Sequence, residues 1–241
     1  MQPMYRIIEN HPDFILVSKF HDVDFHNKGE AIGLVQKIRQ DMELQQLYPV
    51  HRLDSMTSGL IVLAKNKESA QEFAASFREH RVEKFYIALG GTHPRKKQGT
   101  IIGDMKKVRD GKWILCHSRN NPAITQFFSS GLGNGLRLYI LRLLTGKTHQ
   151  IRVALKSLGA PILGDPLYSK KNSGDLIVDR GYLHSYAMGF VLKGKYYRYK
   201  DIPEKGAKAP KKKGGFLKMM EFLTESDDDD EEEEGGKFSF K

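Results

Sequence analysis

Two short, uninterrupted apolar runs constrain the fold of this chain most strongly. They cover residues 14–17 and 60–64, and neither alternates between apolar and polar side chains. A strand with one solvated face alternates, so continuous runs are typical of central strands covered on both faces. Apolar residues at helical spacing mark three further segments, 31–38, 70–77 and 151–158. Asn66 is a candidate N-cap of the second, and Gly159 a candidate C′ residue of the third.

Hairpin signals become frequent in the second half of the chain. Asp110-Gly111 separates two stretches that look like strands, and "GLGNG" at 131–135 separates "AITQFF" from "LRLYILRLL". Such turns join antiparallel strands. We therefore predict the α+β class, with helices packed on a largely antiparallel or mixed central sheet in a single domain.

The composition changes near residue 201. "EKGAKAPKKKGG" is typical of a linker, and residues 227–234 are eight consecutive acids that repel one another. We expect one folded domain over residues 1–200, followed over 201–241 by a basic linker and an acidic, disordered tail. The formal net charge is +10 for the whole chain, so the part without the acidic block exceeds that value by eight charges.

A basic body of this size favours a polyanionic partner, because Lys and Arg that neutralise phosphates release counterions. The alternative is a basic surface that serves solubility alone. Cys116 is the single cysteine, which excludes an internal disulfide and a cysteine-rich metal site and favours a reducing, cytoplasmic setting. No apolar run approaches the roughly 20 residues of a membrane span.

The segment "VHRLDSMTSGLIVLAK", residues 50–65, is the most informative about chemistry. Asp54 precedes a predicted Thr57-Ser58-Gly59 turn that feeds the second apolar strand. That places its carboxylate on a loop at the edge of the sheet, where a rigid scaffold can present it to a substrate. The competing interpretation is an ordinary turn residue paired with Arg52.

Several segments together resemble the RluA-type pseudouridine synthases. "HRLDSMTSGLIVLAK" is similar to the family's signature motif, "EKFYIAL" (83–89) to its K-x-Y-x-A motif, and "LLTGKTHQIRVAL" (143–155) to its G-R-T-H-Q-I-R motif. "GDPLYS" (164–169) and "LHSYAMGF" (183–190) follow where the family has similar runs. The resemblance spans roughly residues 5–200. It implies a pseudouridine synthase fold and a cofactor-free isomerase that converts uridine to pseudouridine in structured RNA, either tRNA or rRNA.

The resemblance also implies roles for individual residues. Asp54 is the catalytic carboxylate, as nucleophile or as stabiliser of charge while the glycosidic bond breaks. Arg152 pairs with Asp54 and holds it ionised. Tyr86 faces the opposite side of its strand from its apolar neighbours and stacks on the flipped base or acts as general base. Arg52 enters the RNA near the target, and Leu183 caps the uracil pocket. The alternatives are a surface Arg152, and Tyr86 and Leu183 as core residues.

Two lysines complete the predicted substrate-binding set. Lys84 is the lysine of the K-x-Y-x-A motif, and Lys147 stands where the family usually has arginine, which keeps the charge but loses the bidentate fork. "SKFHDVDFHN" (18–27) also departs from the family's usual "NKPxGxxVH" stretch. RNA recognition is expected to come mainly from the catalytic body of a monomer.

The histidines of these motifs raise the question of a metal. His51, His149 and His184 lack carboxylates at ligand spacing, so we expect no metal. His149 instead is expected to orient the start of the helix that carries Arg152. Two functions compete with the isomerase: a catalytically silent RNA-binding or RNA-chaperone protein on the same scaffold, and a hydrolase that uses His51 and Asp54 on a bound metal.

Overall fold

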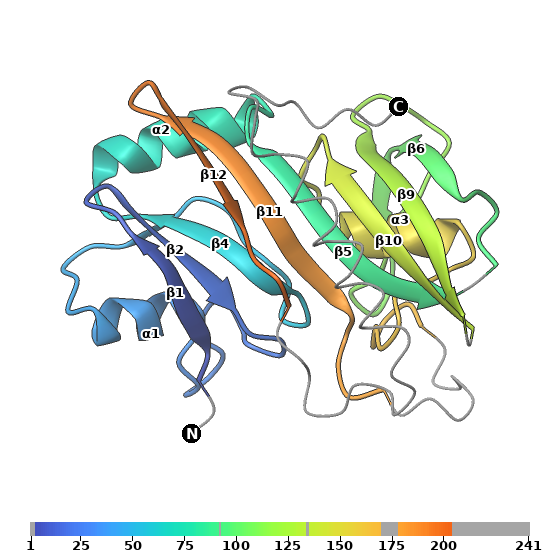
Figure 1. Ribbon diagram of the computed structural model, residues 1–241, viewed down its shortest axis with the longest axis horizontal. Coiled ribbons are helices and arrows are strands. Elements are labelled where there is room, and N and C mark those ends of the chain that lie inside the picture. Colours follow the sequence, from blue (N-terminus) through green and yellow to red (C-terminus); the bar gives the residue numbers. More distant parts are fainter. Residues whose placement is uncertain (1–2, 92, 134, 170–177, 204–241) are drawn as a thin grey trace.

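The computed structural model describes residues 3–91, 93–133, 135–169 and 178–203 (Figure 1). The helices are α1 Leu34–Asp41, α2 Lys67–Arg78 and α3 Gln150–Ser157. The strands in chain order are β1 Tyr5–Asn10, β2 Phe14–Lys19, β3 Tyr48–Pro49, β4 Ser58–Ala64, β5 Glu83–Gly91, β6 Gln98–Gly103, β7 Met105–Lys107, β8 Trp113–Leu115, β9 Ala123–Gly133, β10 Leu136–Leu143, β11 Leu183–Leu192 and β12 Lys195–Lys200.

One large mixed sheet forms the centre of the part of the chain that the structure describes. Its ten strands include the path β1-β2-β4-β11-β5-β10-β9-β6, with β3 added beside β4 and β12 beside β11. Within these residues every neighbouring pair is antiparallel except β4 and β11, where His184 lies opposite Ser58. Figure 1 shows the sheet running across the molecule with helices against it. The predicted α+β class with a mixed sheet is confirmed.

The two apolar runs form β2 and β4, and both strands are buried along their whole length. Ile15 and Ile61 pack on one face of the sheet with residues of α1 and α3. Leu16 and Val62 pack on the other face with Phe73 of α2. Both faces are therefore covered, which is why neither run alternates.

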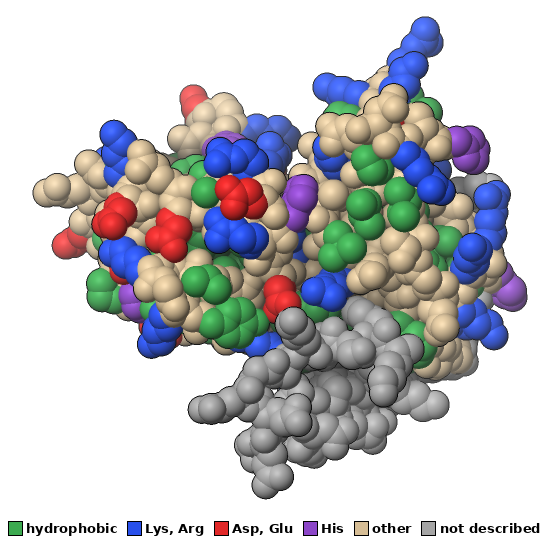
Figure 2. Space-filling view, turned by 90° about the horizontal axis from the view of Figure 1, so that it is seen from above, with side chains coloured by type: hydrophobic (Ala, Val, Ile, Leu, Met, Phe, Trp, Pro, Cys, Tyr) green, Lys and Arg blue, Asp and Glu red, His purple; other side chains and the backbone are tan. Residues whose placement is uncertain are grey.

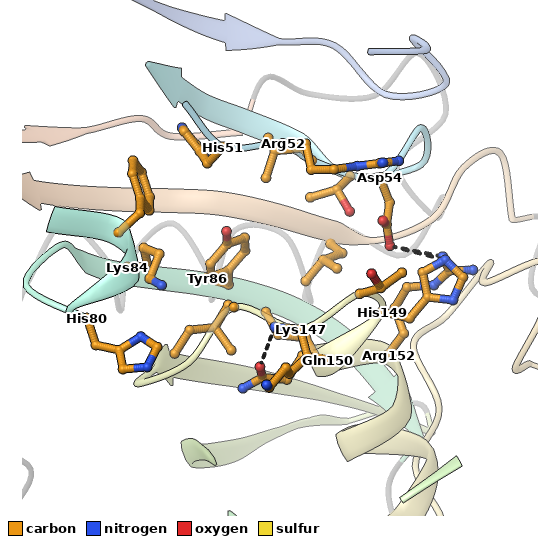
Figure 3. Close-up of a pocket in the computed structure, with 18 of the residues that line it drawn as sticks. His51, Arg52, Asp54, His80, Lys84, Tyr86, Lys147, His149, Gln150 and Arg152 are labelled. Atoms are coloured by element: carbon orange, nitrogen blue, oxygen red, sulfur yellow. Dashed lines mark hydrogen bonds and ion pairs between the residues drawn. The ribbon is translucent and has the colours of Figure 1, made fainter. Parts of the chain in front are cut away.

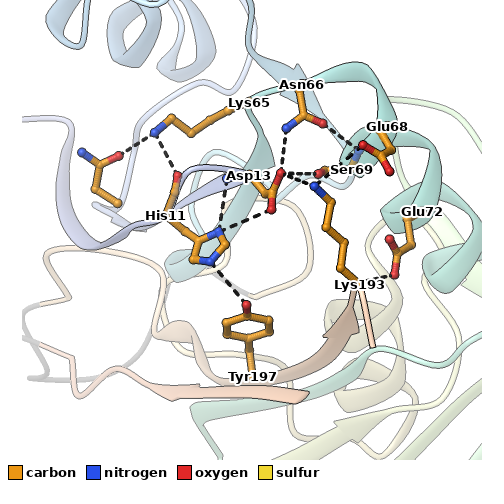
Figure 4. Close-up of polar contacts among 10 residues, drawn as sticks. His11, Asp13, Lys65, Asn66, Glu68, Ser69, Glu72, Lys193 and Tyr197 are labelled. Carbon is orange, nitrogen blue, oxygen red and sulfur yellow. Dashed lines mark hydrogen bonds and ion pairs between the residues drawn. The ribbon is translucent and has the colours of Figure 1, made fainter. Parts of the chain in front are cut away.

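A polar network fixes the start of α2 (Figure 4). The Asn66 side chain accepts the backbone N–H of Ser69 at 2.9 Å, as expected of an N-cap. Its amide donates to Asp13 at 2.9 Å, and Lys193 donates to the same carboxylate at 2.7 Å. The network ties the helix to the β1–β2 and β11–β12 turns, and the predicted cap is confirmed.

Two residues depart from the predicted helical faces. Ala31 lies outside α1, exposed in a short bridge with Lys28. The helix begins only after Gly33, where the chain passes so close to the backbone of His26 that an added Cβ would collide with it. Ala74 of α2 is exposed, because the helix buries Ser69 and Ser76 beside Phe73. Serine side chains are small enough to let α2 pack closely on the sheet. Because serine is polar, the pattern of apolar residues did not identify the buried face of this helix.

The turn predicted at Asp110-Gly111 is present, whereas residues 131–133 of the loop predicted at 131–135 belong to β9. Asp110 and Gly111 both have positive φ, 56° and 69°, between β7 and β8. This is the backbone that a tight hairpin requires and that Asp-Gly favours. Strands β9 and β10 also pair antiparallel. Gly159 follows α3 with φ 80°, as a C′ glycine does.

The last described strand, β12, is followed by Asp201, which is buried. Its carboxylate accepts hydrogen bonds from Ser18 of β2 and, at 2.6 Å, from Arg6 of β1. These contacts join the end of the domain to its first two strands. The expected linker and acidic tail fall on residues 204–241, outside the described residues, and the boundary near residue 200 stays a prediction.

Candidate active site

Asp54 lies in a cleft of about 370 Å³ on the face of the sheet that carries α1 and α3 (Figure 3). Its loop joins β3 to β4, and the N–H of Thr57 donates to the Asp54 carbonyl at 3.0 Å. The turn therefore covers residues 54–57, and β4 begins at Ser58, earlier than predicted. Among the described residues that line the cleft, Asp54 alone has a carboxylate. The other lining residues are Val50, His51, Arg52, Leu53, Thr57, Phe77, His80, Lys84, Tyr86, Leu143, Gly146, Lys147, Thr148, His149, Gln150, Ile151, Arg152 and Leu183.

Lys19, the last residue of β2, anchors the Asp54 loop through hydrogen bonds. Its ammonium donates to the carbonyls of Ser55 at 2.8 Å, Val23 at 2.9 Å and Phe20 at 3.0 Å. Burial lowers the pKa of Lys19 to about 7, yet each of the three N–H bonds of the ammonium has an acceptor. Sequence reasoning gave Lys19 no role, although it stands in the stretch that departs from the family pattern.

Arg152 of α3 forms the predicted ion pair with Asp54, with Nη1 donating to Oδ2 at 3.0 Å. Its side chain is only 4% exposed, and that of Asp54 is 21% exposed. Burial opposes the charge on Arg152, but the carboxylates of Asp165 and Asp54 prevail and raise the pKa of the guanidinium. Arg152 is therefore a buried cation shared between two acids, and the alternative of a surface arginine is wrong.

The second acid, Asp165, was missed by sequence reasoning. It accepts from Nε and Nη2 of Arg152 at 2.8 and 2.9 Å, a bidentate pair, and its side chain is fully buried. The N–H groups of Leu167 and Tyr168 donate to the same carboxylate at 2.9 and 3.1 Å. The only signal was the segment "GDPLYS", which resembles the family but offered no partner for its aspartate.

Tyr86 and Leu183 line the cleft from neighbouring strands, β5 and β11. Tyr86 belongs to the apolar cluster on the cleft face, whereas Phe85 and Ile87 belong to the cluster on the opposite face, so the predicted alternation is confirmed. Burial raises the pKa of Tyr86 to about 12. Its phenol therefore keeps its proton at neutral pH.

His149 stands at the start of α3, as predicted, in the left-handed region with φ 57°. Its Nδ1 is 3.0 Å from the Tyr168 hydroxyl, which accepts the Trp113 N–H at 2.8 Å. The hydroxyl proton can thus be donated to Nδ1, which leaves Nε2 to carry the imidazole proton 3.8 Å from Asp54. Burial lowers the pKa of His149, against the opposing effect of Asp54.

The remaining predicted contacts differ in how they face the cleft. Arg52 is exposed at the rim of the cleft and has no ion pair with Asp54 among the described contacts. The alternative interpretation, in which Asp54 is a turn residue paired with Arg52, therefore lacks its ion pair. Lys84 is buried in the wall. Lys147 lines the cleft, but its ammonium donates to Asn121 at 2.6 Å.

The other two motif histidines serve the fold. His51 accepts the N–H of Val62 at 3.0 Å, and burial lowers its pKa to about 3, with Lys84 adding to the effect. His184 lies between Ser58, at 2.9 Å, and Asp201. In the described part of the chain no three His, Cys, Asp or Glu side chains gather as metal ligands would. None of the helices described there has the length and apolar character needed to cross a bilayer.

Comparisons with known proteins agree with this geometry. The profile of the RNA pseudouridylate synthase family matches residues 13–157. An RNA pseudouridine synthase of Haemophilus influenzae is 46% identical over 200 residues, which cover 83% of this chain and 88% of that protein. The dual-specificity RNA pseudouridine synthase RluA of Salmonella typhi is 36% identical over 136 residues, covering 52% and 61% of the two chains.

Solved structures extend the likeness to the fold. Human RNA pseudouridylate synthase domain containing 1 superposes with a TM-score of 0.71 at 25% identity, covering 84% of this chain and 86% of that one. The human domain-containing 4 protein gives 0.66 at 24% identity, covering 82% and 88%. The profile covers every residue that lines the cleft except Leu183, and the chain belongs to the RluA-type RNA pseudouridine synthases, isomerases that act on RNA.

Proposed function

We propose that Asp54 is the catalytic carboxylate with which this enzyme converts uridine to pseudouridine in tRNA or rRNA. The observation that carries the proposal is that Asp54 is the one carboxylate among the described cleft residues, and that it is partly exposed to a substrate while paired with a buried arginine. A nucleophile or a stabiliser of positive charge must be ionised, and Arg152 places a guanidinium 3.0 Å from the Asp54 carboxylate.

The pair of Arg152 with Asp165 gives Asp54 its orientation. Two hydrogen bonds at 2.8 and 2.9 Å fix the guanidinium plane, so Nη1 is directed at Asp54 before any substrate binds. Preorganised donors of this kind need no rearrangement during the reaction. Arg152 contacts the reacting carboxylate and Asp165 acts through Arg152, so Asp165 is a positioning residue.

Tyr86 and Leu183 are proposed to enclose the extruded base. A phenol that keeps its proton stacks and donates a hydrogen bond, which supports the stacking role of Tyr86 over proton abstraction by a phenolate. Leu183 adds an apolar wall on the adjoining strand. Arg52, exposed at the rim, is proposed to contact phosphate beside the target nucleotide.

The reaction itself is an isomerisation that balances without a second reactant. The bond from N1 to C1′ breaks, the bond from C5 to C1′ forms, and the proton lost from C5 is matched by one gained at N1. Asp54 can attack the ribose or the base, and both routes require the ionised carboxylate. A single catalytic domain over residues 1–200, acting as a cytoplasmic monomer, completes the proposal.

The test is Asp54→Asn, with Asp41→Asn as a matched control on the surface of α1. Each protein is incubated with transcribed tRNA and rRNA, and pseudouridine is mapped at single-nucleotide resolution. Asp54→Asn should form no product while RNA affinity stays within a few fold, because charge is lost at nearly constant volume. Asp41→Asn should behave as wild type. Product formed by Asp54→Asn would refute the proposal, and a wild-type protein that binds RNA without product would favour the silent RNA-binding alternative.

A further inference from the structure

Two lysines are buried in this domain, and they differ in how their charges are satisfied. Lys19 has three carbonyl acceptors at 2.8–3.0 Å. Lys84 is 6% exposed, and the acceptor of its ammonium among the described residues is the Thr145 carbonyl at 3.5 Å, the limit of a hydrogen bond. An ammonium has three N–H bonds to satisfy. Lys84 is therefore a buried cation with unused donors.

Lys84 also lacks a counter-charge. No described carboxylate is within ion-pair distance of it, and the one acid of the cleft, Asp54, is paired with Arg152. Glu83, its neighbour on β5, interacts with Tyr196 and Arg142 instead. Burial lowers the pKa of Lys84, with no acid opposing the shift. A buried charge without a partner is destabilising, so its position needs a reason outside the folding of the domain.

The position of Lys84 supplies that reason. Figure 3 shows Asp54 at one end of the cleft, Tyr86 between, and Lys84 and His80 toward the other end. Phe77 lies beneath the ammonium, 5.9 Å from ring centroid to Nζ, and Gly146 leaves the space beside it free of a side chain. Figure 2 shows a hollow between two lobes, with Lys, Arg and His side chains near its edges.

The spacing matches one step along an RNA strand. Lys84 and Tyr86 are two residues apart on the same face of β5, which separates them by about 7 Å. If Tyr86 stacks on the extruded base, Lys84 lies about one nucleotide step away, where the backbone must pass. Phosphate oxygens would supply the acceptors that the ammonium lacks.

We propose that Lys84, with Phe77 and His80 around it, forms a subsite for an RNA phosphodiester that adjoins the target uridine. Lys84 binds the phosphate, Phe77 closes the apolar side of the subsite, and His80 at the end of α2 borders its open side. The subsite rests on the proposed function, because it takes its register from the base held against Tyr86.

The test measures binding of a short oligouridylate to wild type, Lys84→Met and Lys67→Met over a series of salt concentrations. Lys67 is an exposed lysine at the start of α2 and serves as the matched control. Lys84→Met should weaken binding about tenfold or more at low salt, as for a lost hydrogen bond to a charged group. It should also reduce the slope of log affinity against log salt by about 0.7, the value for one phosphate contact on a single strand. Lys67→Met should change neither.

Two further measurements separate a binding role from a structural one. Wild type and Lys84→Met should bind an oligouridylate with uncharged methylphosphonate linkages equally well. The urea midpoint of Lys84→Met should equal or exceed that of wild type, because Met removes an unpaired buried charge at similar length. A lowered midpoint with an unchanged salt slope would show that Lys84 is structural and overturn the subsite. Loss of product in Asp54→Asn alongside that result would leave the proposed function standing.

Discussion

Replacement of Arg152 by Met should impair both stability and turnover. The substitution removes the partner of Asp165, whose side chain is fully buried. Breaking a buried ion pair by removing one member costs about 3–5 kcal/mol. The N–H groups of Leu167 and Tyr168 still bind the Asp165 carboxylate, so we expect about 3 kcal/mol. For a domain of this size that lowers the melting temperature by about 6–12 °C.

A second substitution separates the two effects. In Arg152→Met with Asp165→Asn, no charge is left buried, and the Asn oxygen can still accept the N–H groups of Leu167 and Tyr168. Removing both members of a buried pair is often nearly neutral, so most of the lost stability should return. Turnover should not return, because Asp54 still lacks its guanidinium.

The assay combines urea denaturation of wild type, Arg152→Met and the double variant with product formation on RNA under saturating enzyme. The loss of turnover is thus accompanied by a loss of stability, because Asp165 is left without its partner. Equal urea midpoints for wild type and Arg152→Met would refute the charge argument. Recovered turnover in the double variant would show that Arg152 acts through the fold and not on Asp54.

Two further predictions concern buried groups near the cleft. Tyr86→Phe should form part of the wild-type amount of product and Tyr86→Ala none, because the ring stacks while its phenol keeps its proton. Equal activity in wild type and both variants would exclude both proposed roles of Tyr86. The pKa of Lys19 is lowered from 10.5 to about 7, so between these values the unfolded chain binds more protons and stability should rise with pH, by at most about 1.4 kcal/mol per pH unit. Urea denaturation from pH 7 to 9 should show this rise in wild type and not in Lys19→Met, and parallel profiles would contradict it.

Local patterns were sufficient to predict much of the scaffold, and the family resemblance supplied the central ion pair. The apolar runs identified β2 and β4 because strands covered on both faces leave a continuous signal. The Asn66 cap and the Gly159 end are likewise decided by a few neighbouring residues. The pairing of Asp54 with Arg152 followed from family motifs, which carry over a contact between residues far apart in the sequence.

The supporting contacts could not be predicted because they depend on how distant loops meet. Asp165 becomes important only when the segment after α3 folds back under Arg152. The role of Lys19 depends on three backbone carbonyls from two loops that converge on its ammonium. Every residue has a backbone carbonyl, so the sequence does not indicate where three of them meet. Lys84 is likewise buried without an acid beside it among the described residues. This can be recognised only when the positions of its neighbours are known.

The single parallel pair within the described sheet explains why the cleft lies where it does. Because β4 and β11 run in the same direction, their first residues lie side by side at the same end of the two strands. The Asp54 loop enters β4 at that end, and Leu183 is the first residue of β11, so carboxylate and apolar wall meet. An antiparallel pair would have placed Leu183 at the far end. Gly59 permits this pairing: it has φ 101°, and an added Cβ would collide with the backbone of Ser185. Gly59 thus permits the register that brings the Asp54 loop to the cleft.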